Sequence, residues 1–349
     1  MRKLLLFPLL LLAACDVFSG PETTDPLDRE AMLEHLNYLA GDSLYGRGSG
    51  SEYELEAAEY VRDEFDEYGL EPGVSGWLQH FTFTTGAALG PDGGLVGDDA
   101  GGAAGAGWDG MTRGNRTFAS VSVQERYSSQ NVLGVLPGDG DLADQWVVIG
   151  AHYDHVGFTQ VSQDSVLVYN GADDNASGTA LLLEVARYLG HHFTRGVARS
   201  LSRRSLMFQA YGAEERGLHG SRFFVNNPTV PLDSITAMIN LDMIGRLRNN
   251  ELYVFGSTTS PLWSPLLFES NEHGIDLLLA GSTGRSDHQN FYDQQIPVVF
   301  FWTGFHDQYH EPEDDVWLLD LDGMEMIGDL TIAILLDLLV RPEPPTFLF

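Results

Sequence analysis

Short apolar runs that could form strands alternate with helix-forming stretches over most of this sequence. The strand candidates are Asn131 to Leu136, Trp146 to Ala151, Ser205 to Tyr211, Ile235 to Leu241, Glu251 to Phe255 and Ile296 to Trp302. The helix candidates are Glu52 to Tyr68, Thr179 to Gly190, Leu218 to Asn226, Pro261 to His273, Asp287 to Tyr292 and Asp322 to Leu339. Such alternation is typical of folds in which helices cover both faces of a sheet. We therefore expect a three-layer α/β/α fold with a mostly parallel mixed sheet.

Polar residues of the kinds that bind metals stand where four of these strand candidates end. They are His152, Asp154 and His155 after the second strand, Glu214 and Glu215 after the third, Asp242 after the fourth, and His306 and His310 after the sixth. In open α/β sheets, ligands bind beyond the carboxyl ends of the strands. We therefore expect these side chains to converge on one edge of the sheet.

Two adjacent carboxylates, Asp173 and Asp174, precede the apolar helix that starts at Thr179. Such a pair repels itself unless a cation or hydrogen-bond donors neutralise it. Taken singly, the polar residues have ordinary explanations, namely a core histidine for His152, a solvated pair for Glu214 and Glu215, a helix cap for Asp242 and a surface residue for His310. Together they supply two imidazoles and several carboxylates, a set that suits two zinc ions.

The formal net charge of −31 excludes one class of partner. The chain has 349 residues, with 19 Lys and Arg against 50 Asp and Glu, and the acids are spread along its length. A surface of this sign repels the phosphates of DNA and RNA. We therefore expect no nucleic-acid partner.

The first fifteen residues have the pattern of an export signal. Arg2 and Lys3 precede an apolar run from Leu4 to Leu12, which is too short to span a bilayer permanently. The run ends in Leu-Ala-Ala-Cys15, which resembles the bacterial lipoprotein signal, and Cys15 is the chain's only cysteine. An ordinary cleaved signal with an accidental cysteine is the alternative. We expect a signal peptide over residues 1–14, a lipidated Cys15, and a tether over residues 15–26 that anchors the exported chain to the membrane of a bacterial cell envelope.

One segment of the domain expected over residues 27–349 differs in composition from the rest. Between Gly86 and Gly114, eleven of 29 residues are glycine. Apolar burial cannot offset the chain entropy of such a run. We expect residues 86–116 to form an excursion from the domain, either a spacer without function or a flap.

The motifs, in this order, are similar to those of the zinc aminopeptidases with two co-catalytic metals. The matching stretches are Tyr38-Leu39-Ala40, Gly46-Arg47, Gly150 to Asp154, Gly171 to Gly178, Ala213 to Ser221, Asn240 to Met243, Ser286-Asp287-His288 and Tyr309-His310. They extend over most of the chain after the signal. The chain lacks the protease-associated insert that some members of this family carry and has the glycine-rich segment instead, so the resemblance does not define the substrate pocket.

The resemblance implies a role for each matching residue. His152, Asp173 and Asp242 would bind one zinc, and Asp173, Glu215 and His310 the other, with Asp173 as the bridging ligand. Glu214 matches the general base, Asp154 the acid that orients His152, and Tyr309 a tyrosine that helps to stabilise the oxyanion. Arg285 and Asp287, at the Ser286-Asp287-His288 motif, are expected to bind substrate.

These roles imply an exported metallo-aminopeptidase that removes N-terminal residues from peptides. Glu214 would take a proton from zinc-activated water and pass it to the leaving amine. A carboxypeptidase or dipeptidase and a one-zinc glutaminyl cyclase are alternatives on the same scaffold, and a binding ectodomain without catalysis is a third. The complete ligand set and the presence of Glu214 favour hydrolysis with two zinc ions.

Overall fold

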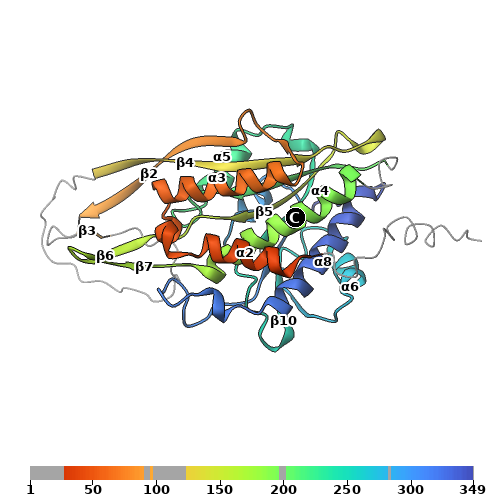
Figure 1. The fold of residues 1–349 in the computed structure, drawn as a ribbon. Helices are drawn as coiled ribbons and strands as arrows, with labels where there is room; N and C mark the ends of the chain where they lie inside the picture. The colour runs from red at the N-terminus through yellow and green to blue at the C-terminus, as the bar shows by residue number, and fades with distance from the viewer. Residues whose placement is uncertain (1–26, 90–94, 97–122, 196–201, 282–283, 349) are drawn as a thin grey trace, which may run out of the picture.

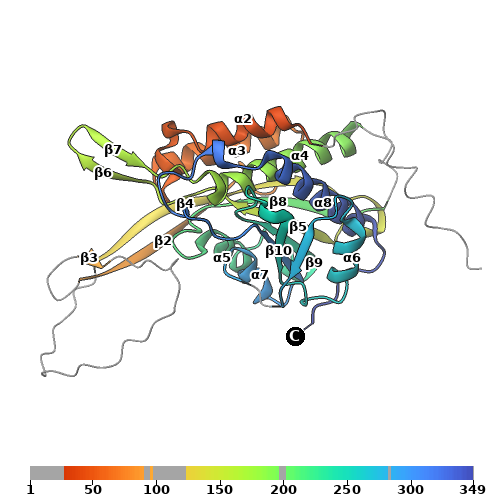
Figure 2. The ribbon, with the colours of Figure 1, turned by 90° about the horizontal axis from the view of Figure 1, so that it is seen from below.

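The computed structural model describes residues 27–89, 95–96, 123–195, 202–281 and 284–348. Within these ranges ten strands form one sheet, in the order β11-β10-β12-β9-β5-β8-β4-β2-β3, with β1 also paired to β4. The strands are β1 Glu71–Pro72, β2 Leu78–Leu89, β3 Leu95–Val96, β4 Val123–Leu136, β5 Trp146–His152, β8 Ser205–Tyr211, β9 Ile235–Leu241, β10 Glu251–Phe255, β11 Asp276–Leu279 and β12 Val298–Trp302. A separate ribbon of β6 (Phe158–Ser162) and β7 (Ser165–Val168) projects from the body (Figures 1 and 2).

The four central strands of the sheet run parallel. They are β12, β9, β5 and β8, whereas β10, β4 and β2 pair antiparallel to their inner neighbours. The last residue of β5, His152, is level with Tyr211 of β8, and Gly150 is level with Asn240 of β9. The carboxyl ends of these three strands therefore meet at one edge, and the residues that follow them are brought together there.

Helices cover both faces of this sheet, as the sequence predicts. α2 (Arg29–Leu39), α3 (Glu52–Glu67), α4 (Gly178–Arg195), α6 (Trp263–Ser270) and α8 (Leu321–Val340) pack on one face, and α5 (His219–Asn226) and α7 (His288–Tyr292) on the other (Figure 2). In β5, Val147 and Ile149 belong to the first, larger core, whereas Val148 belongs to the second. A strand with two apolar faces is typical of a buried parallel sheet. The expected α/β/α fold with a mixed sheet is confirmed.

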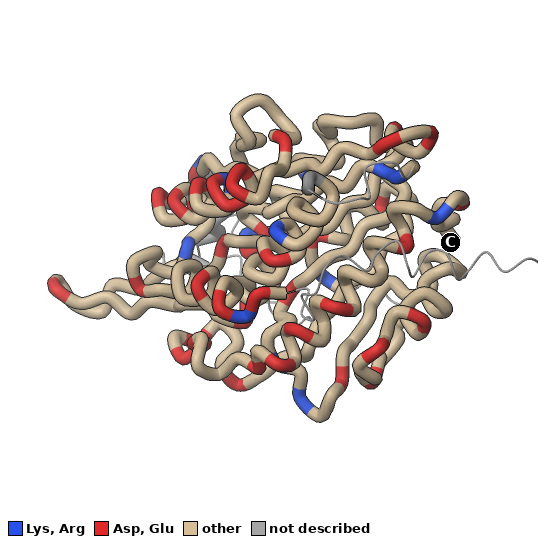
Figure 3. Tube along the Cα trace, turned by 45° about the vertical axis from the view of Figure 1, so that its right-hand side comes forward, with Lys and Arg blue, Asp and Glu red and all other residues tan. Residues whose placement is uncertain are grey.

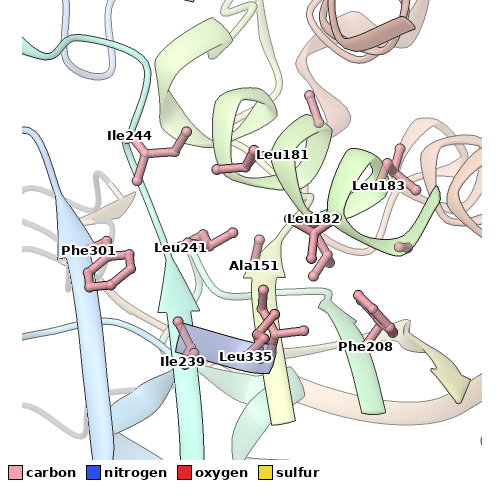
Figure 4. Close-up of a cluster of buried hydrophobic side chains, with 14 of the residues drawn as sticks. Ala151, Leu181, Leu182, Leu183, Phe208, Ile239, Leu241, Ile244, Phe301 and Leu335 are labelled. Carbon is pink, nitrogen blue, oxygen red and sulfur yellow. The ribbon is translucent and has the colours of Figure 1, made fainter. Parts of the chain in front are cut away.

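Helix α4 forms the centre of the larger layer and begins at the edge where the strands end. Its consecutive residues Leu181, Leu182 and Leu183 are all fully buried, and they pack around Ala151 and other apolar side chains of the sheet (Figure 4). A helix that is apolar on several sides must be covered on several sides. The side-chain oxygen of Asn175 accepts a hydrogen bond from the N–H of Gly178 at 3.0 Å, which satisfies a free donor at the start of the helix.

Several strands were not predicted, and one of them changes the account of the glycine-rich segment. In β2, buried Phe81 and Phe83 alternate with exposed threonines, a period-two pattern that indicates a strand. This strand continues to Leu89 and pairs with Leu95–Val96, so the beginning of the expected excursion belongs to the sheet. Of residues 86–116, the structure describes 86–89 and 95–96. The others lie outside the described residues, as do the expected signal peptide, Cys15 and the tether.

Acidic residues are spread over many helices and loops of the described part of the chain (Figure 3). Basic residues are fewer and scattered among them. In the same described ranges, no helix combines the length and the apolar character that a membrane span requires.

The substitution Leu182→Ala tests the larger core. It leaves a cavity at a fully buried position of α4, so the free energy of unfolding should fall by about 2–5 kcal/mol. Leu55→Ala is the matched control, because Leu55 is exposed on α3 and its loss should change stability by only about 0.5 kcal/mol. Chemical denaturation followed by circular dichroism measures both changes. Equal losses in the two variants would contradict the packing described.

Candidate metal centre

Asp174 lies between the side chains of two histidines. Its Oδ1 is 3.3 Å from Nε2 of His152, the last residue of β5. Its Oδ2 is 3.0 Å from Nε2 of His310, in the loop after β12. The two oxygens of one carboxylate thus face two different imidazoles. A carboxylate in this arrangement can bridge two metal ions.

Two further carboxylates complete a donor set on each side of Asp174. Oδ1 of Asp242 lies 3.5 Å from Nε2 of His152, and Oε2 of Glu215 lies 3.1 Å from Nε2 of His310. Tetrahedral zinc with its usual bond lengths would hold its donors about 3.3–3.6 Å apart. The observed separations of 3.0 to 3.5 Å in the two sets therefore fit one zinc ion on each side of Asp174.

Asp173, the expected bridging ligand, points away from both donor sets, so this prediction is wrong by one residue. Its Oδ1 accepts hydrogen bonds from the N–H of Gly245 at 2.7 Å and from the hydroxyl of Ser177 at 3.2 Å. Its Oδ2 lies 3.2 Å from Nε2 of His306. Asp173 therefore anchors the turn to the segment after β9, and its neighbour Asp174 takes the position between the two histidines.

Contacts from distant parts of the chain hold the turn that carries Asp174. Oδ2 of Asp314 accepts the N–H groups of Asp173 at 2.9 Å and of Asp174 at 3.1 Å. Arg246 in turn donates to Oδ1 of Asp314 at 2.7 Å. Gly171 begins the turn with a φ of +58°, and a Cβ at this position would lie 2.3 Å from the carbonyl oxygen of Asp174. Only glycine fits there without displacing the backbone.

Glu214 and Glu215 follow β8 and point in different directions. Glu215 belongs to the second donor set, whereas Oε2 of Glu214 lies 4.0 Å from Nε2 of His152. The carboxylate of Asp154 accepts the N–H groups of both glutamates, at 3.0 and 3.3 Å. Asp154 is expected to orient His152, but the Asp154 carboxylate is 3.8 Å from Nδ1 of the His152 ring. The backbone oxygen of Asp154 is closer to the same Nδ1, at 3.2 Å. The Asp154 side chain thus fixes chiefly the two glutamates.

His155 belongs to the site, although no role was assigned to it from the sequence. It is fully buried, and its Nδ1 lies 2.9 Å from Oε1 of Glu215. Its ring meets that of His310 edge-on, with 5.4 Å between the centroids. The available signal was the second histidine of the His152-Tyr153-Asp154-His155 sequence, directly beyond the end of a buried strand.

Burial and neighbouring groups separate the pKa values of these carboxylates. Burial acts to raise the pKa of Asp174, but hydrogen bonds with His152 and His310 hold it well below its ordinary value. Burial and the charge of Asp174 act to raise the pKa of Glu215, but hydrogen bonds with His155 and His310 outweigh them, so the pKa of Glu215 lies below its ordinary value. In Glu214, burial raises the pKa well above the ordinary range. Asp174 and Glu215 thus favour the charged form, whereas Glu214 favours a proton.

A cavity of about 250 Å³ opens beside the first donor set. Its apolar wall consists of Met243, Phe255, Phe300, Trp302 and Phe305. The polar wall includes Glu214, Asp242 and two residues expected in the site, Arg285 and Tyr309. The ring of Tyr309 stacks on that of His310, with 3.9 Å between the centroids. The cavity can therefore hold an apolar group next to the candidate metal positions.

Asp287, which was expected to bind substrate, is fully buried and does not line this cavity. Burial raises its pKa to about 7. Its neighbour Ser286 donates a hydrogen bond to Oδ2 of Asp242 at 2.6 Å. This prediction is corrected: Ser286 contacts the first donor set and Arg285 reaches the cavity, whereas Asp287 lies behind both.

The sequence that carries this site is similar to those of known proteins. The sequence model of peptidase family M28 matches residues 131–335, which include both donor sets. Aminopeptidase YwaD of Bacillus subtilis (strain 168) is 28% identical over 246 residues, which are 67% of this chain and 50% of YwaD. The chain therefore spans about half the length of this relative.

Two solved structures have the same fold at low sequence identity. BSAP, a zinc aminopeptidase from Bacillus subtilis, has a TM-score of 0.65 at 19% identity, over 93% of this chain and 99% of that chain. A glutaminyl cyclase of Porphyromonas gingivalis has a TM-score of 0.61 at 18% identity, over 90% of this chain and 99% of that chain. Because the fold is shared with more than one kind of enzyme, function has to be argued from the site itself.

Substitution of the two adjacent aspartates separates their positions. Asp174→Asn replaces the carboxylate that faces both donor sets by a neutral amide. Because an amide is a poorer zinc ligand, the zinc content per chain should fall well below that of the wild type. Asp173→Asn should keep the wild-type zinc content, but weaker hydrogen bonds in the turn should lower the free energy of unfolding by about 1–3 kcal/mol. Elemental analysis and chemical denaturation measure the two effects. Loss of zinc from Asp173→Asn alone would contradict the assignment.

Proposed function

The chain belongs to peptidase family M28, and from its candidate metal centre we propose that it is an aminopeptidase that works with two zinc ions. The observation that carries the proposal is the position of Asp174, whose oxygens face two separate donor sets. His152 and Asp242 would hold one ion with Oδ1 of Asp174, and His310 and Glu215 the other with Oδ2. Bound zinc would supply positive charge that polarises a carbonyl group and makes water more acidic.

Glu214 is the residue placed to move a proton in this site. Its carboxylate lines the cavity, and Asp154 fixes its backbone N–H. Because burial raises the pKa of Glu214, this carboxylate binds a proton more readily than an exposed glutamate does. Glu214 would take a proton from the attacking water and deliver it to the amine that leaves. Tyr309 lines the same cavity, and we assign to its hydroxyl group the stabilisation of the carbonyl oxygen.

The two walls of the cavity favour a substrate with a free amine and an apolar first side chain. Phe255, Phe300 and Trp302 form part of an apolar surface that such a side chain would contact. The carboxylates of Glu214 and Asp242, which line the same cavity, attract a protonated amine. A peptide held by these two features has its N-terminal residue in the cavity and its first peptide bond near the candidate metal positions.

The alternative activities make different demands on the site. A glutaminyl cyclase with one zinc requires a single donor set, whereas this site has two, one with His152 and Asp242 and the other with His310 and Glu215. A carboxypeptidase or dipeptidase would bind a free carboxylate, and the cation at Arg285 could serve it. A binding ectodomain would not require the carboxylate of Glu214 beside the first donor set. Tripeptide amides with free and with blocked amines distinguish these activities, because only an aminopeptidase hydrolyses the free-amine form and leaves the blocked form intact. A carboxypeptidase or dipeptidase needs the free carboxylate that the amide lacks, and a cyclase or a binding ectodomain hydrolyses neither form.

The pattern of an export signal at residues 1–15 supports a proposal about location, namely that the chain is anchored by lipid at Cys15 in a bacterial cell envelope.

Cys15→Ser removes the only thiol of the chain, so the variant should take up no fatty-acid label and should leave the membrane fraction. Ser19→Ala, four residues further on, is the matched control and should be labelled as the wild type is. Undiminished labelling of Cys15→Ser would refute the lipid anchor.

Glu214 and Glu215 offer a direct test of the proposed mechanism. Glu214→Gln removes the proton acceptor but keeps the donor sets, so zinc content should stay normal while turnover falls by about 10²- to 10⁴-fold. Glu215→Gln replaces a ligand by a neutral amide and should lose zinc as well as activity. Turnover of an aminoacyl amide and elemental analysis measure both. If Glu214→Gln lost zinc and Glu215→Gln kept it, the two roles would be reversed.

A further inference from the structure

His155 is a buried imidazole that lies close enough to Asp174, Glu215 and His310 to share a metal ion with them, but its Nδ1 is engaged in a hydrogen bond with Glu215. Its backbone N–H donates to the carbonyl oxygen of Arg47 at 3.1 Å. In the described residues its Nε2 is buried without a hydrogen-bond partner. The hydrogen bond between Nδ1 and Glu215 is therefore the one polar contact through which this ring can act.

The two oxygens of Glu215 have different partners. Oε2 lies 3.1 Å from Nε2 of His310 and so faces the second candidate metal position, while Oε1 lies 2.9 Å from Nδ1 of His155. Nδ1 of His155 is 3.8 Å from Oδ2 of Asp174, which is too far for a hydrogen bond. His155 therefore contacts the oxygen of Glu215 that is turned away from His310.

The surrounding backbone fixes the ring of His155 in this position. A Cβ on Gly171 would lie 2.5 Å from ring carbons of His155, so the glycine backbone packs directly on the imidazole. Nε of the fully buried Arg47 donates to the carbonyl oxygen of Tyr153 at 2.8 Å, and its Nη2 donates to that of Gly171 at 3.0 Å. Arg47 thus joins the segment that carries His155 to the turn that carries Asp174.

From these contacts we infer that His155 is a positioning residue for the second metal site. Its Nδ1–H donates to Oε1 of Glu215 and so keeps Oε2 turned towards the metal position beside His310. This role rests on the proposed two-zinc function. A hydrogen bond that already holds the carboxylate in place removes the need to restrict it when the ion binds. Loss of such a hydrogen-bond partner typically weakens metal affinity by about 10- to 100-fold.

Metal binding by His155 variants tests this role without any measurement of activity. Zinc titration of metal-free protein against a chromogenic chelator should show two ions bound to the wild type. In His155→Leu, the second ion should bind about 10- to 100-fold more weakly, while the first binds as before. His155→Asn places an amide N–H close to the position of Nδ1 and should restore the affinity to within a few fold.

A control and a double variant make the test specific. His35→Asn replaces another buried histidine, whose Nδ1 is hydrogen-bonded to the hydroxyl of Tyr60 in a different part of the chain. This variant should leave the affinities for both zinc ions unchanged. Because His155 acts through Glu215, His155→Leu combined with Glu215→Gln should bind the second ion no more weakly than Glu215→Gln alone. Circular dichroism checks that every variant is folded.

Three results would overturn the inference. Unchanged affinity in His155→Leu would show that the hydrogen bond does not matter to the metal. Equal losses in His155→Asn and His155→Leu would show that the ring nitrogen is itself a ligand, and so would additive losses in the double variant. Wild-type protein that binds a single ion would overturn the two-zinc function together with this role, whereas the other outcomes leave that function intact.

Discussion

The mutual repulsion of buried carboxylates is the constraint on which the rest of this site depends. Asp154, Asp174, Glu214, Glu215 and Asp242 converge at one sheet edge with little access to water. Charges buried in this way are costly unless cations or hydrogen-bond donors compensate them. Asp154 is compensated by backbone N–H groups and Ser49. Asp174, Glu215 and Asp242 face imidazoles instead, in the geometry of metal ligands.

The fold solves this problem by placing each donor on a separate rigid element. His152 ends β5, the two glutamates follow β8, and Asp242 follows β9, so three adjacent parallel strands deliver groups to one edge. Asp174 comes from the turn before α4, and Asp314 and Arg246 hold that turn in place. The fully buried leucines of α4 then fix the turn to the core. The candidate metal centre and the core packing are thus linked through a single helix.

Much of this arrangement could be predicted from the sequence, because strand periodicity and residue type are local properties. All six strand candidates are strands of the sheet, and the polar residues predicted after four of them do lie close together, except that His306 faces Asp173. The choice between Asp173 and Asp174 is not local, since it depends on Gly245 and Asp314, which lie 72 and about 140 residues away along the chain. The burial of Asp287 and the contact of His155 with Glu215 likewise arise only from tertiary packing.

We propose that one zinc ion lies beside Asp174 with His152 and Asp242, and a second beside Asp174 with His310 and Glu215. Anomalous diffraction at the zinc absorption edge, from crystals of the zinc-loaded protein, tests it most directly. Two peaks are expected, one beside Oδ1 of Asp174 near His152 and Asp242, the other beside Oδ2 near His310 and Glu215. A single peak, or a peak beside Asp173 and His306, would contradict the account.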